Sequence, residues 1–251
     1  MAKQIEFFKL HGTIGDITFY KSQDGLIARK KGGISAQRIK TGSSFERTRE
    51  NIAEFSKAAR GGKVVREAFL YMVDKAKDNK LVSRLTKEML MVVKSDNISV
   101  RGQRNLVNGQ VQLLRGFNFN NRAHLSTTLK IPFIESIDRA TGTFLISLPS
   151  YTPNESISAP TGTTHYKIVC AGAEMDFINN RYVVNSNESA LLPYNSNPVL
   201  PLDLGMNVSA NSINHLFLVL GIQFYQMVNG ISYSLSNGEF NTLSIVSVEK
   251  A

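Results

Sequence analysis

The stretch LFLVLGIQFYQMVNGISYSL, residues 216–235, carries the clearest fold signal in this 251-residue chain. Apolar residues stand at alternate positions in its first half: Leu216, Leu218, Leu220, Ile222 and Phe224. Asn229-Gly230 follows, a dipeptide favoured in the two-residue turn of a β-hairpin, and residues 231–235 alternate again. The stretch therefore predicts a hairpin at the centre of a β-sheet, with the alternating apolar residues on the core face.

Alternating segments separated by turn residues continue through the second half of the chain. Candidate strands lie at about residues 131–137, 144–148, 166–170 and 243–248. Strands at this spacing predict a β-sandwich of immunoglobulin or fibronectin type III character over residues 129–251. The Cys…Trp…Cys signature of immunoglobulin cores is absent, since the chain has one cysteine and no tryptophan. Only the architecture is implied.

A second hairpin is predicted near the N-terminus. Apolar and polar residues alternate from Ile17 to Tyr20, Asp24-Gly25 is a turn signal, and the chain returns through Arg29. The returning strand runs directly into the densest group of positive charges in the chain. We therefore expect a basic strand at this position.

Helices are predicted between residues 43 and 94. Ser43 and Glu46 fit a capping box, so a first helix begins there, and Gly61-Gly62 ends it. Its inward face carries apolar residues at helical spacing: Phe45, Ile52, Phe55 and Ala59. Two further helices span about residues 64–77 and 81–94. The predicted fold class is α+β, with a basic hairpin-plus-helices region over residues 1–128 and the β-sandwich domain over residues 129–251.

Positive charge is concentrated in the first half of the chain. Residues 1–130 hold 25 Lys+Arg against 11 Asp+Glu, and the remaining residues hold 4 against 9, for a net charge of +9. A chain with one basic and one acidic half is suited to contact a polyanion. It is equally suited to contact the acidic half of a neighbouring copy.

The basic residues gather in two stretches that together form the predicted interaction surface. Its members are Arg29, Lys30, Lys31, Arg38, Lys40, Arg101, Arg104, Arg115 and Arg122. The first stretch is equally typical of an edge strand whose lysines block unwanted pairing. In the second, no acidic residue lies between Arg101 and Arg122, and Phe117 and Phe119 interleave with asparagines. That pattern suits stacking on single-stranded bases, but the two-residue spacing also suits core residues of one strand.

No residue pattern typical of catalysis, of a cofactor or of a metal site is visible. The four histidines, His11, His124, His165 and His215, have no zinc-ligand spacing. Cys170 stands in an alternating strand, which is typical of a small buried hydrophobe. The glycines at residues 61–62 lack the first glycine and the Ser/Thr of a phosphate-binding loop. We therefore expect a protein without enzymatic activity, catalytic residues, cofactor or metal.

The sequence favours a cytoplasmic protein or a component of an assembled particle. A single cysteine excludes an internal disulfide, and the first residues lack the apolar segment of a secretory signal peptide. The longest apolar run, residues 216–228, is too short to cross a bilayer as a helix, which takes about 20 residues. We expect no membrane span.

Four segments together resemble a family of uncharacterised proteins of similar length that is common in Bacteroidota genomes. They are GTIGDITFYK (residues 12–21), FERTREN (residues 45–51), SRLTK (residues 83–87) and GIQFYQMVNG (residues 221–230). This resemblance implies no activity and no site residue. The order of the first elements, a glycine-rich hairpin, a basic strand and an arginine-bearing helix, is also similar to that of phage-encoded proteins. The second resemblance favours a component of a virion-like particle.

These observations favour a structural protein that assembles with itself. Copies would meet basic surface to acidic surface and form a ring, tube or shell, because head-to-tail contacts either close or propagate. A basic nucleic-acid-binding protein is the alternative, with the interaction surface against phosphates. A β-sandwich that binds a small-molecule or glycan ligand is a second alternative, supported by its fold alone.

Overall fold

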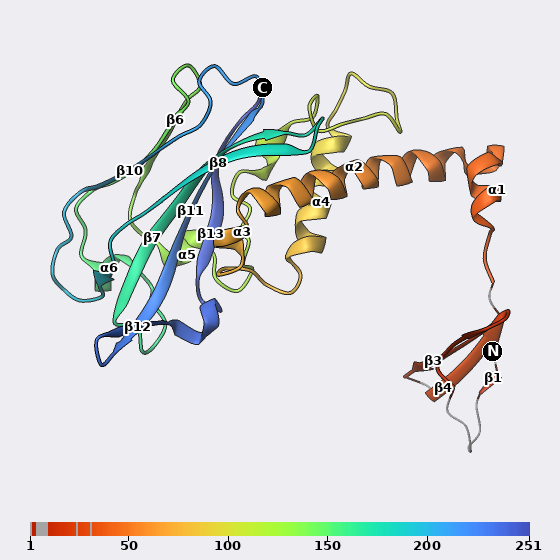
Figure 1. The fold of residues 1–251 in the computed structure, drawn as a ribbon, viewed down its shortest axis with the longest axis horizontal. Helices are drawn as coiled ribbons and strands as arrows, with labels where there is room; N and C mark the ends of the chain where they lie inside the picture. The colour runs from red at the N-terminus through yellow and green to blue at the C-terminus, as the bar shows by residue number, and fades with distance from the viewer. Residues whose placement is uncertain (1, 4–9, 24, 31) are drawn as a thin grey trace. The chain divides into compact units, whose positions relative to one another are not determined.

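The structure is a computed structural model of the chain, and it describes residues 2–3, 10–23, 25–30 and 32–251. Two compact units make up the chain, Met1–Arg49 and Glu50–Ala251 (Figure 1). Helices and antiparallel sheets are both present, so the predicted α+β class is confirmed. The predicted boundary between residues 128 and 129 lies inside the second unit, where helices and strands share one hydrophobic core.

Met1–Arg49 contains a four-stranded antiparallel sheet in the order β1-β4-β3-β2. Its strands are β1 (Ala2–Lys3), β2 (Gly12–Ile14), β3 (Ile17–Ser22) and β4 (Gly25–Lys30). β3 and β4 form the predicted hairpin, although Asp24 of its turn lies outside the described residues. The helix α1 (Ala36–Thr41) and the 3₁₀ turn η1 (Ser43–Phe45) follow. Ser43 thus begins a 3₁₀ turn, where the sequence predicted the N-cap of a long helix.

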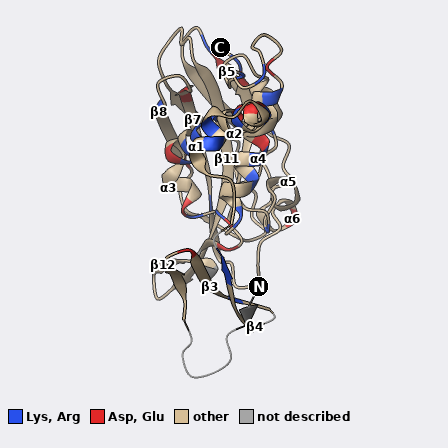
Figure 2. Cartoon of the chain, turned by 90° about the vertical axis from the view of Figure 1, so that its right-hand side faces the viewer, with Lys and Arg blue, Asp and Glu red and all other residues tan. Residues whose placement is uncertain are grey.

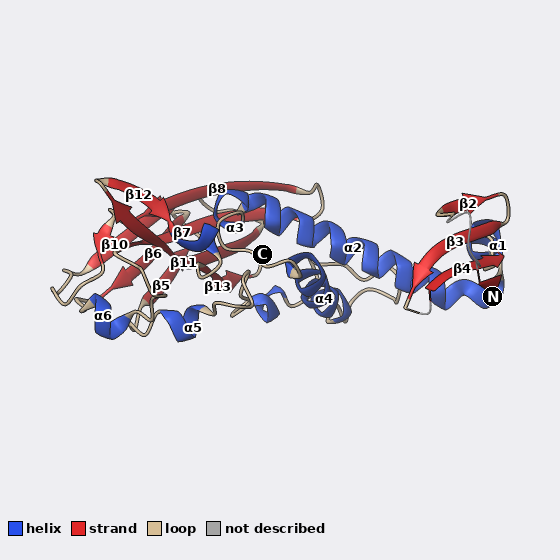
Figure 3. Ribbon diagram, turned by 90° about the horizontal axis from the view of Figure 1, so that it is seen from below, coloured by secondary structure: helices blue, strands red, loops and turns tan. Residues whose placement is uncertain are grey.

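The helix α2 (Glu46–Ala68) continues through Gly61-Gly62, where the sequence predicted its end. Both glycines are buried, and they pack against α4 (Leu81–Lys94), which has the predicted bounds. A Cβ atom at Gly61 would meet the side chains of Leu106 and Met89. Glycine is therefore used here for the close approach of two helices, seen side by side in Figure 3, and not as a helix end.

Two antiparallel sheets belong to the Glu50–Ala251 unit. The larger sheet has the order β12-β11-β7-β8, with β13 also beside β11 and β9 beside β7. Its strands are β7 (His165–Asp176), β8 (Arg181–Glu188), β9 (Leu192–Pro193), β11 (His215–Val228), β12 (Ile231–Ser234) and β13 (Thr242–Glu249). The smaller sheet has the order β10-β6-β5, with β5 (Ile134–Asp138), β6 (Thr143–Leu148) and β10 (Leu202–Asn207).

Short helical segments connect these elements. They are α3 (Leu70–Val73), η2 (Val111–Leu114), α5 (Leu125–Thr128), α6 (Pro153–Ser156) and η3 (Leu235–Gly238). The helix predicted over about residues 64–77 is replaced by the end of α2 and by α3. Within the described ranges, no helix is both long and apolar enough to cross a membrane.

The central strand β11 is buried on both faces. Leu216, Leu218 and Leu220 share a hydrophobic core with the smaller sheet. Phe217 and Val219 share a second core with α2, α4 and η2. The larger sheet is therefore the middle of three layers, with helices on one face and the smaller sheet on the other (Figure 1). An immunoglobulin or fibronectin type III sandwich is not confirmed, because that architecture has no helical layer.

The predicted C-terminal hairpin is present, but only its first strand β11 is central, because β12 lies at the edge of the sheet and all four of its residues are exposed. Val228 lies opposite Ile231, and the turn residues Asn229 and Gly230 have φ angles of 50° and 80°. Two positive φ angles are the signature of a type I′ turn, which the Asn-Gly dipeptide favours. The hairpin was predictable because its turn depends only on local backbone preferences.

The edge strands β8 and β10 of the two sheets meet through side chains. Asn185 Nδ2 donates to Asn207 O at 3.1 Å, and Asn187 Nδ2 donates to Gly205 O at 2.9 Å. Residues 185 and 187 face residues 207 and 205, so the two edges run antiparallel. This contact, which we call the asparagine seam, joins one side of the two sheets.

Candidate functional site

Four members of the predicted interaction surface lie in Met1–Arg49 and are exposed: Arg29, Lys30, Arg38 and Lys40. Lys31 lies outside the described residues. The Arg29 guanidinium on β4 is 5.6 Å from the ring centroid of Tyr20. Arg38 and Lys40 lie in the last turn of α1, where positive side chains interact favourably with the helix dipole. Exposed positive charge is thus held on both a strand and a helix of this unit.

The other four members lie in Glu50–Ala251, where carboxylates pair with most of them. Arg101 Nε lies 3.3 Å from Glu50 Oε2, and Arg101 Nη2 donates to Asn51 Oδ1 at 3.0 Å. Arg115 Nη2 donates to Glu135 Oε1 at 2.5 Å. These charges are therefore largely compensated within the unit.

Arg122 and Arg104 complete the second stretch. Arg122 pairs with Glu239, which is 117 positions away in the sequence. Arg104 is half-buried, and its Nε has no hydrogen-bond partner within the described residues. The stretch without acidic residues in sequence thus meets acidic residues in space, and Figure 2 shows both signs of charge interspersed over this unit. An uncompensated basic patch, as expected over residues 101–122, is not present.

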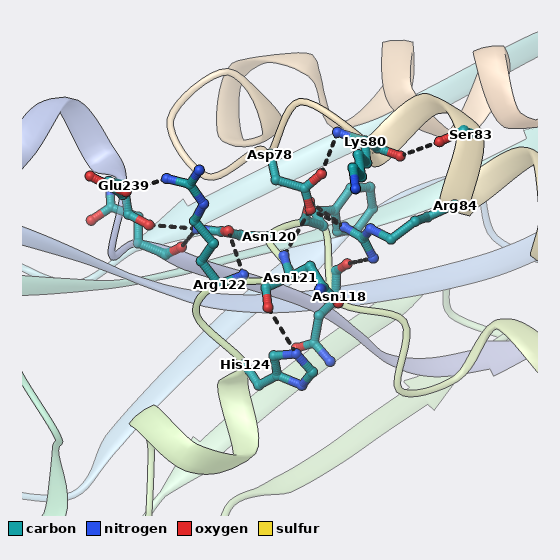
Figure 4. Close-up of polar contacts among 12 residues, drawn as sticks. Asp78, Lys80, Ser83, Arg84, Asn118, Asn120, Asn121, Arg122, His124 and Glu239 are labelled. Atoms are coloured by element: carbon teal, nitrogen blue, oxygen red, sulfur yellow. Dashed lines mark hydrogen bonds and ion pairs between the residues drawn. The ribbon is translucent and has the colours of Figure 1, made fainter.

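A polar cluster around Asp78 and Arg84 organises the segment that holds several of these residues (Figure 4). Asp78 Oδ2 accepts from Arg84 Nη2 at 2.5 Å and from Asn121 N at 2.8 Å, and Oδ1 accepts from Lys80 N at 2.6 Å. Burial opposes ionisation of the Asp78 carboxyl, but the hydrogen bonds from Asn121, Lys80 and Arg84 outweigh it and lower its pKa. Asp78 is therefore a stable negative centre between α3 and α4.

Arg84 extends the same cluster to the aromatic segment. Its Nη1 donates to Asn118 O at 2.8 Å, its Nη2 donates to Phe119 O at 3.0 Å, and its guanidinium lies 5.1 Å from the Phe117 ring centroid. Phe119 is fully buried and contacts Phe117 edge to face, with ring centroids 5.5 Å apart. Phe119 N also donates to Leu243 O at 2.8 Å. Phe119 is therefore a core residue and Phe117 packs against the core, which supports the core interpretation over base stacking, although no strand spans the two residues.

Asparagines connect the cluster to the C-terminal strands. Asn120 Nδ2 donates to Glu239 O at 2.8 Å and to Asn241 O at 2.9 Å, while Asn120 Oδ1 accepts from Arg122 N. His124 Nε2 lies 3.2 Å from Asn121 O. A hollow of about 240 Å³ beside the cluster carries three cations and three acids: Lys75, Lys77, Arg122, Asp74, Asp78 and Glu239. The charges balance and the hydrogen bonds are internal, so the cluster acts as a clamp on this segment.

Asp78 and Arg84 are functional residues that were not predicted from the sequence. Arg84 acts on Asn118 and Phe119, which are 34 and 35 positions away, so no local pattern marks it. Over the described ranges, no group of three or more His, Cys, Asp or Glu side chains is placed to hold a metal ion. Burial raises the pKa of the Cys170 thiol to about 12, so this thiol is protonated at neutral pH.

Among the members of the predicted interaction surface, the described ones on Met1–Arg49 are thus exposed, and three of the four on Glu50–Ala251 pair with glutamates. No protein-family model matches this chain, and neither a curated protein nor a solved structure shows significant similarity to it.

Proposed function

We propose that this protein is a non-enzymatic structural subunit of a homo-oligomeric assembly, in which Met1–Arg49 packs against a neighbouring copy. The observation that carries the proposal is the exposed apolar pair Ile14 and Ile17. These residues lie directly opposite each other on β2 and β3, and they are 61% and 45% exposed.

A single sheet is stable only when one of its faces is covered by a second layer. Among the described residues of Met1–Arg49, Ile27 is the one buried side chain. Burial of one isoleucine contributes about 2 kcal/mol, far less than the conformational entropy lost by four ordered strands. An apolar surface of a neighbouring copy would supply the covering layer that the described residues of this unit do not provide.

The helix α2 offers a second exposed apolar site, on Glu50–Ala251. Ile52 and Phe55, predicted to face the core, are each 55% exposed. The opposite face of the helix is buried because the Glu54 carboxylate accepts Gly102 N at 2.8 Å, and because Lys57 Nζ donates to Arg104 O at 2.9 Å. Exposed apolar groups on both units are typical of protein interfaces.

Nucleic-acid binding is the second candidate, and one observation favours it. Met1–Arg49 holds ten Lys+Arg against four Asp+Glu, whereas the rest of the chain holds 19 against 16. Contact with a polyanion would therefore involve the N-terminal unit rather than residues 101–122. This candidate keeps the first stretch of the expected interaction surface and leaves out the second, so self-assembly and phosphate binding compete for the same unit.

Sedimentation or light scattering of the full chain at micromolar to near-millimolar concentration tests the assembly proposal. We expect a defined oligomer that is lost in the double variant Ile14→Thr/Ile17→Thr, because threonine keeps strand propensity while it removes apolar surface. The matched control is Thr13→Ser/Thr18→Ser, on the other face of the same two strands. A strictly monomeric wild-type chain, or equal assembly of both double variants, would contradict the proposal.

A further inference from the structure

A hollow of about 370 Å³ lies beside α2 within the Glu50–Ala251 unit. Two cations, Lys57 and Arg60, line it from successive turns of the helix, and its lining includes no carboxylate. Leu106, Phe177 and Ile178 give it apolar walls. The hollow therefore combines positive charge with an apolar interior.

The charges of Lys57 and Arg60 differ from most arginines of the same unit in lacking an acidic partner. Within the described ranges, no carboxylate lies within ion-pair distance of either side chain, whereas Arg84, Arg101 and Arg115 each have one. The acid nearest in sequence, Glu54, is occupied by Gly102 N. The positive charge in the hollow is thus available to an anion from outside the chain.

Lys57 is held in a fixed position. Its Nζ donates to Gly102 O at 3.3 Å and to Arg104 O at 2.9 Å, so two of the three N–H donors of the ammonium are used. Arg60 uses Nε toward Ser56 O at 3.4 Å, and its two Nη groups remain available. One ammonium donor and one guanidinium edge can therefore meet a ligand.

Two aspartates hold the loops that form the walls of the hollow, because each accepts hydrogen bonds from backbone N–H groups. Asp96, fully buried, accepts Asn105 N at 3.1 Å, and Lys250 Nζ donates to Asn108 O at 2.9 Å. On the other wall, Asp176 Oδ1 accepts Ile178 N at 2.9 Å and thereby orders the turn between β7 and β8. The hollow is pre-formed, which lowers the entropic cost of binding.

Phe177 completes the wall from the core side. Its ring lies 5.5 Å from the His215 ring and 6.1 Å from the Phe217 ring, measured between centroids. The amides of Asn105, Asn108 and Asn180 lie among the lining residues and offer further hydrogen bonds. A small inorganic anion would leave the apolar walls in contact with water, and a neutral hydrocarbon would leave two unpaired cations.

We propose that this hollow is a binding site for a small organic anion, with a carboxylate or phosphate head toward Lys57 and Arg60 and an apolar body against Leu106, Phe177 and Ile178. Its volume is in the range of sites for small organic ligands, which is about 300–1,000 Å³. The site is distinct from the surfaces proposed for assembly, since its lining includes no residue of Met1–Arg49 and neither Ile52 nor Phe55.

Titration calorimetry with octanoate, acetate, octan-1-ol and octylammonium tests this site in the full chain. We expect saturable 1:1 binding of octanoate, and weaker binding of acetate and octan-1-ol by about tenfold or more, because each lacks one half of the interaction. Octylammonium should not bind. Equal binding of octanoate and octylammonium, or no binding of octanoate, would overturn the proposal.

Two variants test whether octanoate binds in this hollow. Arg60→Gln should weaken octanoate binding by about tenfold through loss of a charged hydrogen bond, and Ile178→Ser should weaken octanoate but leave acetate unchanged. Both residues are exposed, so these changes leave the fold intact. The control is Lys63→Gln, one turn further along α2 and outside the hollow, which should have no effect. If Lys63→Gln weakened octanoate binding as much as Arg60→Gln, binding would depend on general surface charge and this site would be excluded. Sedimentation of the same samples separates ligand binding from self-association.

Discussion

Asp78 and Arg84 are joined by a contact of 2.5 Å, and each also binds the backbone of the segment from residue 118 to residue 121. The pair therefore fixes this segment against α4, and the hydrogen bond from Phe119 N to Leu243 O joins the same segment to β13. Because the Asp78 side chain is 9% exposed, its charge depends on Arg84 for compensation.

Replacement of Arg84 by methionine should destabilise the chain strongly. The change leaves Asp78 without its cation and frees the carbonyls of Asn118 and Phe119, at a cost of roughly 3 kcal/mol. Urea unfolding measures the difference. The control is Lys87→Met, an exposed position on the same helix, which should lie within about 0.5 kcal/mol of wild type. Equal stability of both variants would mean that the clamp is not needed.

The adjacent glycines of α2 should respond oppositely to alanine. At Gly62 a Cβ would lie 3.6 Å from Leu85 Cγ, an ordinary contact, so Gly62→Ala should stabilise by up to about 1 kcal/mol through helix propensity. At Gly61 the new atom would displace Leu106 and Met89, so Gly61→Ala should destabilise by about 1–3 kcal/mol. Thermal melts of the two variants measure both changes in stability. A stabilising Gly61→Ala would contradict the described packing.

Stability should fall as the pH is lowered from about 6.5 to about 4. Burial, with the nearby charges of Lys250 and Arg139, lowers the pKa of His215 from 6.5 to about 4. Between these values the unfolded chain binds a proton that the folded chain does not, so acid favours unfolding by at most about 1.4 kcal/mol per pH unit. In His215→Asn, which retains an acceptor for Ala251 N, this part of the pH dependence should disappear. An unchanged profile in urea titrations at several pH values would assign the effect elsewhere.

A charge inside the central strand should be far more damaging than one at its end. Leu220 is fully buried on β11, so Leu220→Asp should cost roughly 4 kcal/mol or prevent folding. Val228 is 45% exposed on the same strand, and Val228→Asp should cost less than about 1 kcal/mol. Circular dichroism and thermal melts compare the two. Wild-type stability of Leu220→Asp would refute the three-layer core.

Any nucleic-acid binding should depend on the N-terminal unit. Replacing four of its exposed basic residues, Arg29, Lys30, Arg38 and Lys40, by glutamine should reduce both the affinity and its salt dependence, because fewer counterions are released. The same replacement of Arg101, Arg115 and Arg122 should change binding little, since these side chains pair with glutamates. Fluorescence anisotropy with a labelled single strand measures both. A larger effect of the second set would reverse the assignment.

Local physics explains what the sequence made predictable. The Asn229-Gly230 turn and the bounds of α4 follow from backbone preference and helical periodicity, which neighbouring residues determine. The buried face of α2 could not be predicted in this way, because Ile52 and Phe55 have helical spacing whichever face of the helix is buried. The Glu54 carboxylate determines which face is buried, because it accepts a hydrogen bond from Gly102 N, 48 positions away.

The candidate site shows the same limit. The exposed basic residues of the first stretch could be listed from composition, but the acids that compensate Arg115 and Arg122 lie 20 and 117 positions away. The continuous apolar character of β11 was a signal that both of its faces are buried. It was interpreted instead as one alternating face, and the helical layer of the core was missed for that reason.

The asparagine seam has a consequence for motion in the second unit. Parting β8 from β10 there would break the two hydrogen bonds that the side chains of Asn185 and Asn187 donate, each worth about 1 kcal/mol, and would leave the β7–β8 and β6–β10 ladders intact. Opening of this kind is sub-global and needs far less free energy than unfolding. The backbone amides of β8, which pairs with β7 alone, should therefore exchange their hydrogens with solvent before those of β11, which is paired on both sides.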